Sequence, residues 1–154
     1  MDFSHLSGYS TAALWAATFA FALVSGLIPF ILNIELYLLA VAALTDAPAV
    51  AIVGLATAGQ TLAKCVLYLV GKGALNIKWI KRGAASKAAE AFARRPGHSL
   101  AVVSLSSVIG VPPLYGVSLF AGTLRLPFVA FTIIIVIGRV IRFGAVYLAP
   151  GLFK

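Results

Sequence analysis

Four ionisable side chains lie inside otherwise apolar stretches of the sequence: Glu35, Lys64, Arg139 and Arg142. A charged group inside a bilayer costs about 3 kcal/mol or more, so such residues are candidates for a binding or transport site. Glu35 is the one acid in any apolar stretch, and Arg139 lies near the centre of the last stretch. We expect these two to pair, directly or through water, with Arg142 as a second donor, because an unpartnered charge at that depth is strongly unfavourable.

Two roles fit the expected pair: it holds two parts of the chain together, or it binds a proton or an anionic head group. Lys64, seven residues before Gly71, is expected to snorkel to the nearer membrane face, and Arg142 can do the same toward the other face. Small polar side chains at the expected helix breaks either line a polar cavity or form local hydrogen bonds. These are Asn33, Ser106 and Ser107.

No other catalytic or metal-binding pattern occurs in the sequence. His5 and His98 stand alone, and the chain has neither an HExxH metal motif nor a glycine-rich phosphate loop. We therefore expect no enzyme activity, no metal and no cofactor.

The elements that position these residues must lie in lipid. Of the 154 residues, 62% are hydrophobic and 10% are charged, and the mean hydropathy is +1.05. Soluble domains carry roughly a quarter charged residues, so a soluble fold is excluded. We expect an all-α polytopic membrane protein with a single membrane domain over residues 1–154.

Four apolar stretches cover most of the chain, at residues 12–44, 47–71, 99–124 and 126–150. The second and fourth are each long enough for one tilted membrane-spanning helix, which needs roughly 20 residues. The other two are broken near their centres by residues that interrupt a helix, namely Pro29, Gly110, Pro112 and Pro113. Each broken stretch is either a kinked span or a re-entrant hairpin, and the charge distribution favours two hairpins.

Positive charge is concentrated between Lys72 and Arg95, whereas residues 1–63 contain neither Lys nor Arg. The positive-inside rule places this basic segment in the cytoplasm, and two hairpins then return Arg125 to the same side. Residues 72–96 are expected to lie at the membrane surface, with an amphipathic helix over 77–95.

This basic helix is either a topology anchor or a surface that recruits anionic lipid head groups. The head-group contacts are then expected from Lys78, Lys81, Arg82 and Lys87. A basic juxtamembrane segment of this kind accounts for most of the net charge of +8 without nucleic acid as a partner.

A faint internal repeat links the two halves of the chain. The shift along the sequence that places Pro48 on Pro127 also brings together Gly59 and Gly138, Tyr68 and Tyr147, Leu69 and Leu148, and Ala42 and Ala121. The repeating unit is a hairpin followed by a span, at residues 12–71 and again at 97–150. Because the two hairpins enter from opposite faces, we predict an inverted repeat, an architecture that places transport sites near the midplane.

The order of several short motifs resembles the DedA superfamily, also called the SNARE-associated Golgi protein or VTT domain family. The resemblance covers about residues 20 to 150. It is carried by the run Pro29-Phe30-Ile31-Leu32-Asn33-Ile34-Glu35, Asp46, Gly71-Lys72, Ala121-Gly122, Leu126-Pro127-Phe128, Phe131 and Gly138-Arg139.

The resemblance implies two oppositely entering re-entrant hairpins and a role in moving lipids between leaflets, polyprenyl phosphate among them, or in supporting the proton gradient. Glu35 matches the membrane-embedded acid of the family and Asp46 its second acid. Where many bacterial members have two arginines in the second hairpin, this chain has Val108 and Leu114.

We hypothesise that Arg139 and Arg142 replace those missing arginines from the neighbouring helix. The chain also lacks the additional C-terminal helix of longer members, so we expect a short, divergent member of the family.

The expected function is that of a flippase or scramblase that moves a phospholipid or polyprenyl-phosphate head group through a midplane site. Three alternatives remain: a proton-coupled exporter of small cationic solutes, a structural membrane factor, and an interaction protein that acts through 77–95. Expected partners are membrane lipids, with protons and a second copy of the chain left open. The expected location is a prokaryotic cytoplasmic (inner) membrane with residues 72–95 in the cytoplasm.

Overall fold

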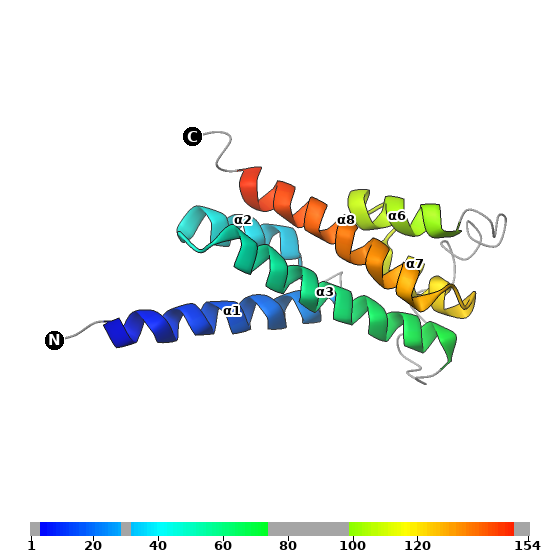
Figure 1. Cartoon of the computed structure of the whole chain (residues 1–154), viewed down its shortest axis with the longest axis horizontal. Coiled ribbons are helices and arrows are strands. Elements are labelled where there is room, and N and C mark those ends of the chain that lie inside the picture. Colours follow the sequence, from blue (N-terminus) through cyan, green and yellow to red (C-terminus); the bar gives the residue numbers. More distant parts are fainter. Residues whose placement is uncertain (1–3, 29–31, 74–98, 150–154) are drawn as a thin grey trace.

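The described part of the chain is all helical, as the sequence predicts. The computed structural model describes residues 4–28, 32–73 and 99–149, with side chains from residue 11 onward. It contains the helices α1 (Ser4–Leu27), α2 (Ile34–Leu44), α3 (Ala49–Lys72), α6 (Ser99–Ile109), α7 (Leu114–Thr123) and α8 (Phe128–Leu148) (Figure 1). The basic segment with Lys78, Lys81, Arg82 and Lys87 lies outside the described residues, and so does Pro29.

Among the residues that the structure describes, two helices, α3 and α8, are long and apolar enough to cross a membrane. With 24 and 21 residues they extend roughly 36 and 32 Å, against a hydrocarbon thickness of about 30 Å. They coincide within two residues with the apolar stretches at 47–71 and 126–150. The fold is therefore consistent with a helical membrane protein.

The four other helices form two pairs beside these long helices. The chain reverses direction between α1 and α2 and again between α6 and α7 (Figure 1). In the first pair α1 packs on α3 and α2 on α8, whereas in the second α6 packs on α8 and α7 on α3. The helices α2, α6 and α7 have 10 or 11 residues each, so each is roughly 16 Å long, too short to cross a bilayer alone.

The helix ends follow local sequence signals, with one difference from expectation. Asn33 accepts a hydrogen bond from the Glu35 amide at 2.9 Å and so caps α2, while Pro48, Pro113 and Pro127 are the N-cap residues of α3, α7 and α8. The helix α1 begins at Ser4, eight residues before the apolar stretch 12–44, because backbone hydrogen bonds can continue a helix beyond the residues that are apolar.

Glycines set the distance between the long helices and their neighbours at several crossings, of which two are related by the predicted internal repeat. A Cβ atom at Gly59 of α3 would lie 2.6 Å from the carbonyl oxygen of Phe19 in α1. A Cβ atom at Gly138 of α8 would lie 2.6 Å from the Cβ of Ser107 in α6. Both distances are shorter than nonbonded contact allows, so each crossing requires a residue without a side chain.

Two tyrosines near the ends of the long helices bond to the chain just before the other long helix. Tyr68 of α3 donates to the carbonyl of Leu126 at 2.5 Å, and Tyr147 of α8 donates to the carbonyl of Ala47 at 2.8 Å. The shift that relates the two halves of the sequence carries Tyr68 onto Tyr147 and Ala47 onto Leu126. The donors of the two bonds thus occupy equivalent positions of the sequence repeat, and so do the two acceptors.

Candidate functional site

A cavity of about 300 Å³ lies where the two interrupted helix pairs meet the middle of α3 and α8. Both breaks contribute to its wall, through residues 32–35 after α1 and through Gly110 and residues 113–115 around the start of α7. Its polar or charged lining residues are Ser25, Asn33, Glu35, Gln60, Lys64, Tyr115, Arg139 and Arg142.

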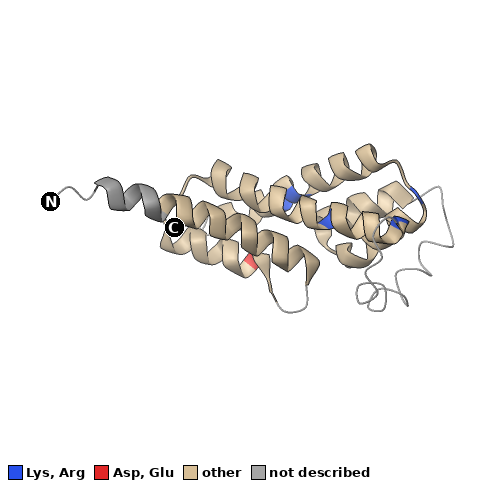
Figure 2. Ribbon diagram, turned by 90° about the horizontal axis from the view of Figure 1, so that it is seen from below, with Lys and Arg blue, Asp and Glu red and all other residues tan. Residues whose placement is uncertain are grey.

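The cavity lies between two apolar clusters, and this placement can be followed along each long helix. On α3, Ile52 belongs to one cluster and Tyr68 to the other, with Lys64 between them. On α8, Ile135 and Phe143 belong to different clusters, with Arg139 between them. Charged residues are sparse elsewhere on the described helices. In Figure 2 the helices are accordingly almost entirely tan, the colour of uncharged residues.

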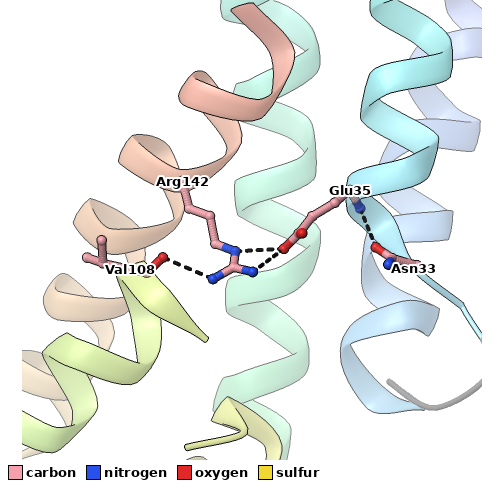
Figure 3. A network of polar contacts seen from close by, with 4 residues as sticks. All are labelled: Asn33, Glu35, Val108 and Arg142. Carbon is pink, nitrogen blue, oxygen red and sulfur yellow. Dashed lines mark hydrogen bonds and ion pairs between the residues drawn. The ribbon is translucent and has the colours of Figure 1, made fainter. Parts of the chain in front are cut away.

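An ion pair between Glu35 and Arg142 crosses one side of the cavity (Figure 3). Both Nε and Nη2 of Arg142 contact the same carboxylate oxygen, Oε1 of Glu35, at 2.6 and 2.5 Å. The third nitrogen, Nη1, donates to the Val108 carbonyl at 3.0 Å. The Glu35 and Arg142 side chains are 33% and 22% exposed, so this side of the cavity is accessible. The contacts join α2, α8 and α6 through one guanidinium group.

The direct contact of Glu35 is therefore with Arg142, expected as the second donor, and not with Arg139, on which Glu35 acts only through its charge. The two arginines are three residues apart and so point about 60° apart around α8. Glu35 lies on the side that Arg142 faces.

Arg139 is deeply buried in the cavity wall. Its side chain is 8% exposed, and its Nε atom has no hydrogen-bond partner among the described residues. The guanidinium carbon lies 5.3 Å from the centre of the Phe143 ring, a distance that allows a cation–π contact. A buried guanidinium nitrogen without a partner is costly, so a hydrogen-bond acceptor that reached it would stabilise this residue of the cavity wall.

Lys64 does not snorkel to a membrane face as expected. It is 2% exposed, and its amine donates to the Gly26 carbonyl at 2.6 Å, close to the end of α1. One turn earlier, Gln60 donates to Ser25 at 2.9 Å, and Ser25 donates to the carbonyl of Ala22. The predictions from sequence did not include Gln60 or Ser25, although the spacing of Gln60 and Lys64 places both on one face of α3.

Three residues predicted for the site lie elsewhere. Asp46 is exposed beyond the end of α2 that is farther from Glu35, roughly 16 Å along the helix. Ser106 donates to the Pro112 carbonyl at 2.5 Å, and Ser107 donates to carbonyls of α8, the nearer at 3.3 Å. Neither serine lines the cavity. Their hydroxyl groups instead donate to backbone carbonyls, at the end of α6 for Ser106 and where α6 crosses α8 for Ser107. Asn33, Gly110 and Pro113, by contrast, do line it.

Basic side chains outnumber acids around the cavity. Lys64, Arg139 and Arg142 face a single carboxylate, that of Glu35. The positive charges repel one another across the site, since Arg139 interacts unfavourably with both Lys64 and Arg142. Within the described residues, the arrangement therefore suits an anion that accepts several hydrogen bonds. Phosphate is such a group, and arginine is well suited to bind it.

No protein-family model, curated protein or solved structure matches the chain. The resemblance to the DedA superfamily thus stays a prediction from short motifs. The chemistry of the cavity is the stronger guide to function.

Proposed function

We propose that the protein moves the anionic head group of a membrane lipid, a phospholipid or a polyprenyl phosphate, between leaflets through this cavity. The observation that carries the proposal is a basic cavity formed by two helix breaks between two apolar helices of membrane-spanning length. A polar head group needs hydrogen-bonding partners inside the bilayer, whereas its acyl or prenyl chain can stay in lipid.

Arg139 supports an anionic substrate. Its side chain is buried and its Nε has no partner among the described residues, and the nearby Glu35 carboxylate is already bound by Arg142. A phosphate beside Arg139 and Lys64 would add negative charge next to both side chains and accept a hydrogen bond from the unpartnered Nε of Arg139. A small cation would instead meet three basic side chains, so a cation exporter fits the cavity less well.

The proposal includes an inverted repeat in which the two helix pairs are re-entrant hairpins that enter from opposite faces. The shift that places Pro48 on Pro127 carries the first residue of α3, Ala49, onto Phe128, the first residue of α8. The reciprocal tyrosine bonds and the close glycine crossings follow the same shift.

Helix packing supports the repeat as well. In the first pair the earlier helix contacts α3 and the later one contacts α8. In the second pair the earlier helix contacts α8 and the later one contacts α3, as an internal repeat requires. In such an arrangement both helix breaks, and the cavity between them, lie near the midplane of the membrane.

The test is leaflet exchange in liposomes that contain the full chain and labelled lipids with or without a phosphate group. We expect exchange of the phosphate-bearing lipid only, and a loss of about tenfold to hundredfold in Arg139→Gln, as for one or two strong hydrogen bonds. Lys72→Gln is the matched control, because Lys72 is exposed at the end of α3 and does not line the cavity.

Equal exchange of both lipids, or full activity in Arg139→Gln, would contradict the proposal. A structural membrane factor would show neither exchange nor dependence on Arg139.

A further inference from the structure

We infer that Glu35 acts as a built-in competitor for the head group: it occupies Arg142 until a phosphate displaces it, and the exchange frees the start of α2 from α6 and α8. This inference rests on the proposed function, since it assumes that the cavity receives a phosphate-bearing lipid. It adds a regulatory role for one carboxylate in the same site.

The geometry of the ion pair is the first support. Arg142 directs both Nε and Nη2 at a single oxygen of Glu35. The strongest arginine–oxyanion contacts are forks in which two nitrogens meet two oxygens. A phosphate has several terminal oxygens and can complete such a fork, so it can replace the carboxylate without leaving the guanidinium short of acceptors.

The second support is that the two arginines differ in their hydrogen-bond partners. Every nitrogen of Arg142 already has an acceptor, through Glu35 and Val108. Arg139 has an unpartnered Nε within the described part of the chain and also interacts electrostatically with both Glu35 and Arg142. An anion that binds first at Arg139 therefore comes within range of the pair, where its charge repels the Glu35 carboxylate and attracts Arg142.

The third support is the position of Glu35 in the chain. It lies in the first turn of α2, directly after the break, and its partner Arg142 also holds Val108 at the end of α6. The guanidinium group of Arg142 thus connects the start of α2 in the first helix pair to the end of α6 in the second (Figure 3). Breaking the Glu35 contact uncouples α2 from α6 at the cavity, as a gate in a transport cycle requires.

Binding of inorganic phosphate to the purified full chain, measured by calorimetry, tests the competition. We expect Glu35→Gln to bind phosphate about tenfold more tightly than the wild type, because the competing charge is gone. Arg142→Gln should bind at least about tenfold more weakly, because it leaves Glu35 unpaired beside the site. In the double variant Glu35→Gln/Arg142→Gln the net cavity charge equals that of the wild type, so binding should recover to at least the wild-type level.

A distance measurement tests the release of α2. Spin labels at Leu36→Cys on α2 and Leu105→Cys on α6, both exposed positions, are placed in a Cys65→Ser background. We expect phosphate to lengthen the distance in the otherwise wild-type chain. In Glu35→Gln the distance should be longer even without phosphate.

A Glu35→Gln protein that binds phosphate no more tightly than the wild type, or an unchanged label distance, would overturn the inference. If Arg139→Gln still loses phosphate binding in that case, the proposed function stands without the competitor. If phosphate does not bind, or binds regardless of Arg139, both the inference and the proposed function fail.

Discussion

Gly138→Ala is expected to push α6 away from α8, and Gly144→Ala on the same helix is its control. A Cβ at Gly138 would lie 2.6 Å from the Cβ of Ser107, whereas a Cβ at Gly144 would have no atom of the described residues within 4 Å. Nonbonded carbons rest about 3.5 Å apart, so α6 has to retreat by roughly 0.9 Å. Overpacking of this kind costs about 1 to 3 kcal/mol, against about 1 kcal/mol gained when alanine replaces glycine in a helix.

The retreat also reaches the cavity, because Val108 directly follows Ser107. The Val108 carbonyl lies 3.0 Å from Nη1 of Arg142, and a displacement of roughly 0.9 Å would carry it beyond hydrogen-bonding range. Loss of a hydrogen bond from a charged donor adds about 1.5 to 3 kcal/mol. We expect Gly138→Ala to lower the free energy of unfolding by about 1.5 to 5 kcal/mol in all.

The assay is an unfolding titration with a denaturing detergent in mixed micelles, followed by far-UV circular dichroism. Gly144→Ala should leave the free energy of unfolding unchanged or raise it by up to about 1 kcal/mol. On α3, Gly59→Ala should destabilise the protein and Gly54→Ala should not, because only the first position faces another helix closely. If Gly138→Ala proves as stable as Gly144→Ala, the close crossing of α6 and α8 is refuted, and with it the placement of Val108.

Two further predictions use the same titration. Tyr68→Phe and Tyr147→Phe should each lower the free energy of unfolding by about 0.5 to 1.5 kcal/mol, since each removes one hydroxyl bond to a carbonyl; a loss in only one variant would argue against equivalent halves. Arg125→Gly should raise the free energy of unfolding by up to about 1 kcal/mol, because Arg125 has a φ of 53° at the turn after α7, a conformation that favours glycine. A decrease would show that the arginine side chain contributes more than its backbone strain costs.

Local sequence signals predicted the helix breaks well. Proline removes a backbone donor and clashes with the preceding turn, whatever the rest of the fold does. Accordingly α1 ends at Leu27, shortly before Pro29, and α6 ends at Ile109, shortly before Pro112. The long helices likewise follow from the length of their apolar stretches.

The partner of Glu35 could not be predicted in this way. Arg139 and Arg142 both lie in the middle of α8, and the rotation of α8 about its own axis decides which one faces Glu35. That rotation depends on tertiary contacts such as the Gly138 crossing with Ser107. Sequence distance alone cannot supply this information.

Lys64 illustrates the same limit. Its distance from the end of α3 shows that its side chain can reach the membrane surface, but not that it lies on the face covered by the first helix pair. The burial of Lys64 and its bond to Gly26 arise only when α1 packs against α3.

The reciprocal tyrosine bonds bear on how the chain assembles as it is made. Ala47 belongs to the first half of the chain, yet its carbonyl accepts a hydrogen bond from Tyr147, one hundred residues later. The first half therefore leaves the ribosome without this bond and gains it only after α8 has been synthesised. A chain truncated before Tyr147 would therefore leave the Ala47 carbonyl without this hydrogen bond, just before the start of α3.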